Sequence, residues 1–161
     1  MKWLMCLLLV FALWMLLFWE FSLSVLASGL FFALIVSTLL GDIFPDNLHS
    51  LLNPRRWFFL LLYLPYFLFY CVKANLDVAL RVLHPDVPIH PGIVKVTTTL
   101  TTPLAKTALA NSITLTPGTL TVDVDGQDLY VHWINVSGQD VETRSKLICG
   151  VFEPMLRRIF E

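Results

Sequence analysis

Apolar residues dominate the first forty positions of the chain, and one acidic residue divides them into two runs. The runs cover residues 3–19 and 22–40, and Glu20 is the one acidic or basic residue from Trp3 to Leu40. A helix needs about 20 apolar residues to cross the hydrocarbon core of a bilayer. The pattern therefore predicts a helical hairpin of two membrane spans, with Glu20 at the interface where the chain turns.

A secretory signal peptide is the alternative interpretation of the first 27 residues. Lys2 would supply the positive n-region, and Val25-Leu26-Ala27 would supply a cleavage site. The apolar run is too long for a signal peptide and resumes at once through Leu40, which favours the membrane hairpin.

The second run carries small residues at intervals of four. Gly29, Ala33 and Ser37 fall on one face of a helix, where small side chains let two backbones approach closely. This spacing predicts a packing face for another helix, in this chain or in another one.

A third apolar run follows a polar connection that contains Gly41-Asp42 and Pro45-Asp46. We predict a third span over residues 57–75, which is long enough if Lys73 extends its aliphatic stem to the interface. Pro65 lies inside this run and predicts a kink, which neighbouring helices tolerate in a membrane. The three spans define a predicted transmembrane region over residues 1–83.

The end of the third helix is predicted to be amphipathic, reaching about Leu83. It places Lys73, Asp77 and Arg81 one turn apart on one face. These residues could form a charged relay beside a proton or cation path. A solvated or headgroup-facing stripe with ion pairs of about 0.2–0.5 kcal/mol each is the simpler interpretation, and we favour it.

From residue 84 the pattern changes to short alternating segments. Prolines in residues 84–92 predict a stiff linker. Residues 93–161 predict a small α+β domain built from a strand, a helix, a hairpin and a helix. The expected strands are 93–100, 119–124 and 129–135, and the expected helices are 103–110 and 141–160. A unit of about 70 residues has a marginal core, so we expect it to lean on another part of the protein.

Local signals refine this domain. Thr102 is a predicted N-cap before Pro103, and Asn111 with Ser112 is predicted to cap the end of the same short helix. Asp125-Gly126 predicts the hairpin turn. In the closing helix, the residues expected to face the core are Val141, Leu147, Ile148, Val151 and Phe152, and those expected to face water are Arg144, Lys146, Arg157 and Arg158.

Composition agrees with an integral membrane protein that has a small soluble tail. The chain is 57% hydrophobic and 14% charged, against about 25% charged in ordinary soluble proteins. The net charge of −1 and the absence of a basic patch argue against nucleic acid as a partner.

No constellation of residues in the sequence predicts catalysis, a cofactor or a metal site. Cys6, Cys71 and Cys149 form no C-x-x-C pair, and the four histidines are scattered. Three aspartates near the hairpin tip lack the glycine and glutamate positions of a calcium loop. They are Asp123, Asp125 and Asp128. We therefore predict that the chain is not an enzyme.

Several motifs together resemble the MnhE/MrpE family, whose members are the E subunits of the Mrp-type multisubunit Na⁺/H⁺ antiporters. They are Asn53-Pro54-Arg55 before the third run, Ala74 to Val78, Pro91-Gly92-Ile93, Leu129 to Val136 and, above all, the run A-N-S-I-T-L-T-P-G-T from Ala110 to Thr119. The resemblance covers about residues 1 to 160. It implies a bacterial inner membrane, a cytoplasmic tail, assembly with several other subunits, and export of Na⁺ coupled to entry of H⁺.

The predicted role is an accessory, structural subunit that is not itself the ion carrier. A carrier needs ionisable groups inside the membrane, and residues 3–40 and 58–72 contain only Glu20, at an edge. An equivalent subunit of a membrane-bound hydrogenase or related respiratory complex is the alternative, and a free-standing membrane-anchored binding module is a third possibility. The candidate structural and assembly residues are Asn75, Asp77, Asn111, Thr114, Thr116, Pro117 and Gly118.

The positive charges do not decide on which side of the membrane the tail lies. Lys2, Arg55 and Arg56 fall on one side of the predicted spans, and Lys73, Arg81 and Lys95 on the other. The unpaired Cys149 favours a reducing, cytoplasmic side for the tail.

Overall fold

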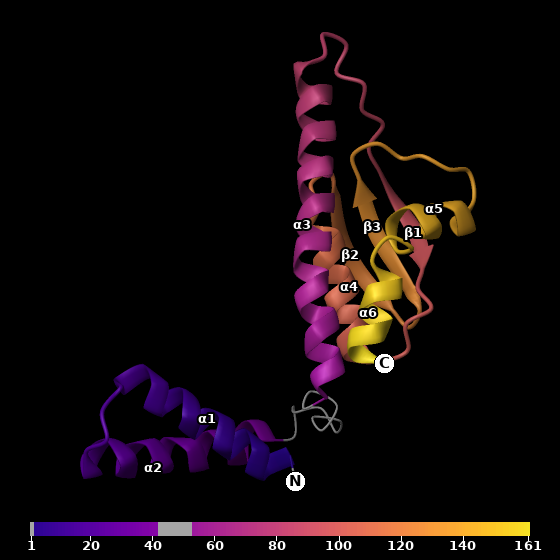
Figure 1. Cartoon of the computed structure of the whole chain (residues 1–161). Helices are drawn as coiled ribbons and strands as arrows, with labels where there is room; N and C mark the ends of the chain where they lie inside the picture. Colours follow the sequence, from indigo (N-terminus) through magenta and orange to yellow (C-terminus); the bar gives the residue numbers. More distant parts are fainter. Residues whose placement is uncertain (1, 42–52) are drawn as a thin grey trace. The chain divides into compact units, whose positions relative to one another are not determined.

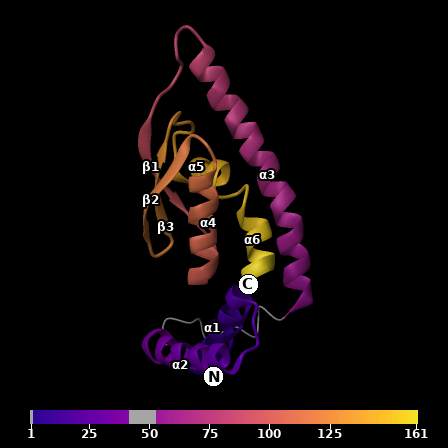
Figure 2. The ribbon, with the colours of Figure 1, turned by 90° about the vertical axis from the view of Figure 1, so that its left-hand side faces the viewer.

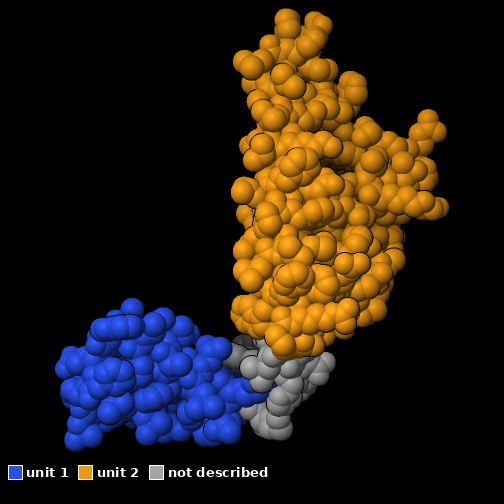
Figure 3. All heavy atoms as spheres, in the orientation of Figure 1, with its two compact units in different colours: residues 1–52 blue, residues 53–161 orange. Residues whose placement is uncertain are grey.

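The computed structural model describes residues 2–41 and 53–161. The chain divides between Leu52 and Asn53 into two compact units, which Figure 3 shows in different colours. Most of the predicted polar connection, including Asp42 and Pro45-Asp46, lies outside the described residues. The predicted boundary placed the third apolar helix with the membrane region, whereas the compact units group it with the α+β domain.

The first unit is the predicted helical hairpin. Helix α1 (Lys2–Phe18) and helix α2 (Leu23–Leu40) are joined by a short turn in which Trp19 has a φ of 49°. The buried residues of α2 are Gly29, Ala33 and Ser37, which confirms the predicted packing face.

The partner of that packing face is α1. A Cβ atom added at Gly29 would lie 2.6 Å from Cδ1 of Trp14, so the close approach of the two helices requires glycine there. Trp14 also stacks on Phe32 with ring centroids 5.1 Å apart, and Cys6 of α1 is fully buried. The hairpin therefore satisfies its small-residue face within the chain.

The second unit begins with the 30-residue helix α3 (Pro54–Leu83). The Asn53 side chain accepts a hydrogen bond from the N–H of Arg55 at 3.0 Å, and Pro54 occupies the first turn, where its missing N–H costs nothing. Pro65 lies inside the helix, which ends at Leu83 as predicted. By length and composition, α2 and α3 could each cross a membrane, while α1 is a shorter apolar helix. The third span stays a prediction.

The α+β domain contains a three-stranded antiparallel sheet with the order β1-β3-β2 (Figure 1). The strands are β1 (Gly92–Thr97), β2 (Thr119–Asp125) and β3 (Asp128–Trp133). Asp125 pairs with Asp128 across the turn, in which Gly126 has a φ of 59°. The Asp125-Gly126 hairpin prediction is confirmed.

Three helices separate the sheet from α3. They are α4 (Pro103–Leu115), α5 (Val141–Ile148) and α6 (Glu153–Phe160). Figure 2 shows the sheet on one side of this layer and α3 on the other. The core joins Val96 and Val131 of the sheet to Leu109 of α4, Leu156 of α6 and Tyr63 of α3. The predicted fold class is confirmed, and α3 is the element against which the small domain packs.

Two helix predictions need correction. The helix that begins at Pro103 runs to Leu115 and not to Ala110, although its predicted Thr102 cap is present, with the hydroxyl accepting from the N–H of Ala105. The closing helix is divided into α5 and α6, because Pro154 cannot donate the N–H that a continuous helix needs.

The division of the closing helix changes which of its residues face the core. Val141 and Leu147 are 40% and 49% exposed, contrary to the prediction, while Ile148 and Phe152 are buried as expected. Val151 is half-buried, and Leu156 and Ile159 complete the buried face of α6.

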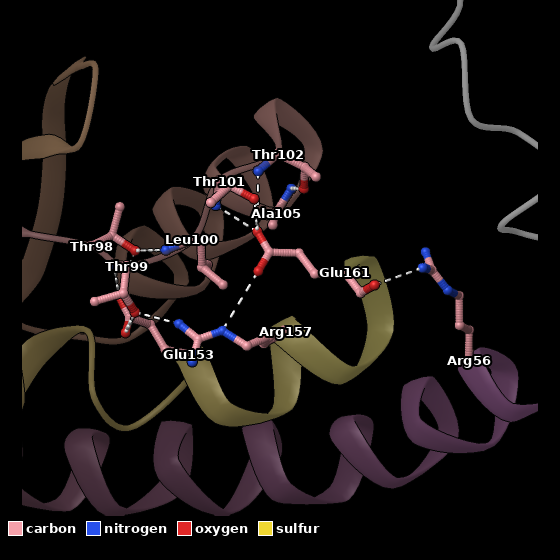
Figure 4. Close-up of polar contacts among 10 residues, drawn as sticks. All are labelled: Arg56, Thr98, Thr99, Leu100, Thr101, Thr102, Ala105, Glu153, Arg157 and Glu161. Carbon is pink, nitrogen blue, oxygen red and sulfur yellow. Dashed lines mark hydrogen bonds and ion pairs between the residues drawn. The ribbon is translucent and has the colours of Figure 1, made fainter.

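Two glutamates, one at each end of α6, hold the segment between β1 and α4 (Figure 4). The Glu153 carboxylate accepts from the hydroxyl of Thr98 and, at 3.0 Å and 2.8 Å, from the N–H and hydroxyl of Thr99. The Glu161 carboxylate accepts from the hydroxyl of Thr101 at 2.9 Å and from the N–H of Thr102 at 3.1 Å. These bonds attach a segment without regular structure to α6 through the backbone N–H groups and the threonine hydroxyls of that segment.

Arginines complete this network. Arg157 donates to the Thr99 hydroxyl and lies 3.5 Å from the Glu161 carboxylate, and Arg56 of α3 donates to the Glu161 carbonyl oxygen at 3.1 Å. The network therefore joins α6, the threonine segment and the first turn of α3.

Lowering the pH should weaken this network by protonating the Glu161 carboxylate. Burial by itself raises the pKa of Glu161, but hydrogen bonds from Thr101 and Thr102 and the charge of Arg157 hold that pKa below its usual range. Because the folded-state pKa is the lower one, the carboxylate stabilises the fold above its unfolded pKa of about 4.3, and this contribution is lost as pH falls through the folded pKa. We expect the unfolding temperature of the wild type, measured by circular dichroism in mild detergent, to fall more steeply between about pH 5 and pH 3 than that of Glu161→Gln.

The matched control is Glu142→Gln, which removes a carboxylate bound to Lys146 at the exposed surface of α5. This variant should keep the wild-type acid slope. Equal slopes for wild type and Glu161→Gln would show that the Glu161 carboxylate does not set the acid response.

Candidate functional site

The run from Ala110 to Thr119 joins three elements of the second unit. Its first part forms the end of α4, Thr116 is the C-cap, Pro117 and Gly118 make the turn, and Thr119 begins β2. The predicted cap at Asn111 and Ser112 is wrong, because both residues lie inside α4, where Asn111 is exposed and Ser112 is buried.

Threonine hydroxyls cap the end of α4. The last carbonyl groups of a helix have no partner within the helix itself. The Thr119 hydroxyl donates to the carbonyl oxygens of Ile113 at 2.6 Å and Thr116 at 3.0 Å, and the Thr116 hydroxyl donates to the carbonyl oxygen of Ser112 at 2.8 Å. Threonine side chains of this run therefore provide the cap that was predicted for Asn111 and Ser112.

Two further bonds fix α4 against β2. The N–H of Thr121 donates to the Thr114 hydroxyl at 3.1 Å, and the Thr121 hydroxyl donates to the carbonyl oxygen of Ala110 at 3.1 Å. Helix and strand are thus fastened on both sides of the turn, and the threonine content of the run has a structural cause.

Gly118 has the backbone conformation that the turn requires. Its φ is 90°, a region that residues with a side chain rarely adopt. Its carbonyl oxygen accepts from the N–H of Ile134 at 2.8 Å. An added Cβ would lie 2.9 Å from Cγ2 of Ile134 and 3.4 Å from Cγ2 of Val78 on α3. Conformation and space both select glycine at this position.

The same run contacts α3 at three levels. The Tyr63 and Ser112 hydroxyls lie 2.6 Å apart in the core, and Ser112 also donates to the carbonyl oxygen of Ala108 at 2.7 Å, so Tyr63 is the donor. The Cys71 thiol donates to the carbonyl oxygen of Leu115 at 3.8 Å, and Val78 lies beside Gly118. The run is therefore an internal joint between α4, β2 and α3.

A groove of about 500 Å³ opens between this joint and the second half of α3. Asp77, Thr116, Pro117 and Gly118 all line it, so the structure brings four of the predicted site residues together. Trp133, Ile134 and Phe152 give it an apolar wall. Asn75, Asn111 and Thr114 do not line the groove; Asn75 instead donates to the carbonyl oxygen of Cys71 at 2.8 Å.

The charged stripe of α3 runs along the rim of the groove. Arg81 donates to Asp77 at 2.7 Å and to the carbonyl oxygen of Pro88 at 3.0 Å, which ties the linker to the helix. Lys73 also lines the groove, and its ammonium group has no hydrogen bond or ion pair with any residue that the structure describes. Among the described residues, this geometry is that of an exposed Asp77–Arg81 ion pair beside a Lys73 ammonium group that is not part of it.

Asp128, one of the aspartates near the hairpin tip, has a structural role. Asp128 binds Lys95 at 2.6 Å and the Thr97 hydroxyl at 3.0 Å, and both bonds lower the pKa of its carboxyl.

Within residues 2–41 and 53–161, no group of three or more histidine, cysteine, aspartate or glutamate side chains could hold a metal. Burial raises the pKa of Cys149 to about 12, so this thiol is an unreactive core residue and a poor reporter of orientation.

The sequence interpretation missed the two glutamate anchors and the Tyr63–Ser112 pair. The threonine-rich run Thr97 to Thr102 was a usable signal for the anchors, because so many donors close together need acceptors. Nothing in the sequence indicates which hydroxyl Tyr63 meets.

Comparisons with known proteins place most of the chain in one family. Residues 7–159 match the family described as Na⁺/H⁺ ion antiporter subunit. The E subunit of the Na⁺/H⁺ antiporter of Alkalihalophilus pseudofirmus is 40% identical over 92 residues, which are 56% of this chain and 55% of that protein. The matched part thus spans about half the length of that relative. The E1 subunit of the Na⁺/H⁺ antiporter of Staphylococcus haemolyticus is 32% identical over 71% of this chain and 75% of its own.

One solved structure resembles the chain over nearly its whole length. A chain in the structure of the membrane-bound sulfane sulfur reductase, an archaeal respiratory membrane complex, is 44% identical with a TM-score of 0.77. The match covers 99% of both chains.

The Tyr63–Ser112 pair gives a test of the joint. Tyr63→Phe should cost about 1 kcal/mol of unfolding free energy, because Ser112 keeps its bond to Ala108. Ser112→Ala leaves the buried Tyr63 hydroxyl without its acceptor and should cost more, about 1–3 kcal/mol. The double variant should be no less stable than Ser112→Ala. Urea unfolding in mild detergent, followed by circular dichroism, measures all three.

Thr107→Ala is the control, since its hydroxyl bonds the carbonyl oxygen of Pro103 at the exposed face of the same helix. It should change the free energy of unfolding by about 0.5 kcal/mol or less. Additive costs in the double variant would show that Tyr63 and Ser112 are not coupled.

Proposed function

We propose that this chain, which belongs to the MnhE/MrpE family of Na⁺/H⁺ antiporter subunits, is an accessory subunit that supports assembly of a multisubunit membrane complex and does not carry ions itself. The observation that carries the proposal is the chemistry of the apolar helices. Residues 3–18, 23–40 and 57–72 contain no acidic, basic or histidine side chain. Ion carriers place such residues at membrane depth, where they bind and relay the ions.

The complex that fits this family is a monovalent cation/proton antiporter in the bacterial inner membrane. In it, larger partner subunits would move Na⁺ and H⁺, and this chain would contribute the α1–α2 hairpin to the membrane part. We place the α+β domain on the cytoplasmic side. The joint from Ala110 to Thr119, with Asn75 and Asp77 of α3, is the proposed structural and assembly segment.

A second candidate is the equivalent subunit of a respiratory membrane complex. The 44% identity over 99% of the chain to a subunit of the sulfane sulfur reductase favours it. Mild solubilisation, native gel electrophoresis and mass spectrometry separate the two. Iron–sulfur or nickel proteins in the same band indicate the respiratory complex, and antiporter subunits alone indicate the antiporter. A band of the isolated chain would instead indicate a free-standing membrane-anchored module.

The lone subunit should show no transport. We expect vesicles that contain only the purified chain to give the same pH change under a sodium gradient as protein-free vesicles, because the apolar helices offer no site for an ion. The solubilised native complex, reconstituted in the same lipids, is the positive control. Sodium-driven acidification or alkalinisation by the lone subunit would refute the accessory role.

Gly118→Val should lower the amount of assembled complex. The valine forces an unfavourable φ at a cost of about 1 kcal/mol or more, and its side chain meets Ile134 and Val78. Gly126→Val is the matched control, because Gly126 also has a positive φ but has open space around it. We expect a larger loss of complex for Gly118→Val on a native gel, with unchanged apparent sodium affinity per assembled complex. Full assembly with a shifted sodium dependence would instead place the segment on the ion path.

A further inference from the structure

The outward face of α3 is apolar along the whole helix. Its exposed members include Trp57, Leu61, Leu68, Val72, Leu76 and Leu83, which are between 51% and 80% exposed. Asn75 is the polar residue among them. A 30-residue helix is about 45 Å long, and soluble proteins rarely leave so large an apolar patch in water. A membrane or a protein partner must therefore cover this face.

The α+β domain covers the inward face of α3 from the first turn to about Val78, and the linker covers its last turn. Arg56 reaches the Glu161 carbonyl oxygen at 3.1 Å, and Tyr66 donates to the Val151 carbonyl oxygen at 2.7 Å. Further along, Val78 lies beside Gly118, and Arg81 reaches the Pro88 carbonyl oxygen at 3.0 Å. Figure 2 shows the other helices beside the part of α3 that begins at Pro54, and the following linker near its other end. Lipid can reach α3 from one side only.

This one-sided covering conflicts with a transmembrane position for α3. A spanning α3 would carry the adjoining domain into the hydrocarbon, including the Glu153, Arg157 and Glu161 network. Each charge at the bilayer centre costs about 2.5–3.5 kcal/mol even on the lower scales. The open edges of β1 and β2 would also leave unpaired backbone groups in lipid, which membrane proteins avoid.

We propose that α3 lies along the membrane surface, with its apolar face in the lipid interface and the α+β domain above it in water. Helices of this kind bury their apolar face about 5–10 Å into the boundary between headgroups and acyl chains. The charged network of Glu153, Arg157 and Glu161 and the open edges of the sheet then remain in water. The predicted third span is replaced by a surface anchor that fits the same run of apolar residues.

Cationic side chains mark one edge of the apolar face and identify lipid as its occupant. Arg55 and Lys73 are about five helical turns apart, so they project from the same side of α3. Lys73 has no polar partner among the described residues, and the Arg55 guanidinium lies 5.8 Å from the Phe59 ring centroid. Long cations at the edge of an apolar face can reach anionic headgroups. A purely apolar helix of another protein would offer them no counter-charge.

The depth of the outward face in the bilayer tests whether α3 lies along the membrane surface. Nitroxide labels are placed one at a time at Leu61, Leu68, Val72, Leu76 and Leu83 of the full chain, with native cysteines changed to alanine, in nanodiscs that contain phosphatidylglycerol. Accessibility to oxygen and to a water-soluble relaxation agent gives the depth of each label. We expect all five at similar shallow depths, about 5–10 Å below the headgroups. A label at Glu142 of α5 is the aqueous control.

Two other outcomes would overturn the proposal. From Leu61 to Leu83, a spanning helix advances by about 33 Å, so its depth profile would rise and fall with a maximum in the middle. A face covered by another protein would be protected from both agents. Neither result would bear on the accessory role, which the transport measurements test.

A second measurement needs no substitution. The wild-type complex is irradiated in bilayers that contain a photoactivatable phosphatidylglycerol with the reactive group near the headgroup. We expect cross-links along the outward face from Trp57 to Leu83. Cross-links confined to the two ends of α3 would instead indicate a span, and their absence along the whole helix would indicate a protein partner.

Discussion

The packing of one face of α3 against the α+β domain is the constraint on which the rest of the second unit depends. A three-stranded sheet with three short helices buries little apolar area by itself. Tyr63 enters the core from α3, and Phe67 and Tyr70 contact Phe152 with ring centroids 5.9 Å and 6.0 Å apart. Aromatic pairs of this kind contribute about 0.5–1.5 kcal/mol each beyond the area they bury. Phe152 directly precedes α6, so these contacts position α6. The glutamates at the two ends of α6 in turn hold the threonine segment.

Local patterns predicted the parts of the fold that local chemistry controls. The four-residue spacing of Gly29, Ala33 and Ser37 identified a packing face, and Asp125-Gly126 identified the hairpin. The Thr102 cap also follows from residues within one turn of each other. The break in the closing helix escaped because Pro154 follows an apolar stretch whose period resembles one continuous helix.

The inward face of α3 was not recognised in the sequence, and this explains why the candidate site was only partly foreseen. Residues 57–72 carry no charged side chain on any side, and the spacing of Tyr63, Tyr66 and Tyr70 on one helix face was the available sign of the side that meets protein. The run from Ala110 to Thr119 stood out in the sequence, but its bonds to Tyr63 and its proximity to Val78 depend on residues more than thirty positions away. Only three-dimensional packing makes Gly118 part of the same joint as α3.

Pro65 fits the surface position of α3 on independent grounds. It is exposed, and as a proline it has no N–H to donate to the carbonyl oxygen of Leu61, one helical turn earlier on the outward face. In the hydrocarbon core, this carbonyl oxygen would need a neighbouring helix or an ordered water to satisfy it. At the membrane surface, water and headgroups can hydrogen-bond the same oxygen. The proline is therefore compatible with a helix whose outward face lies in the interface, while Tyr63, two residues away, points into the core of the domain.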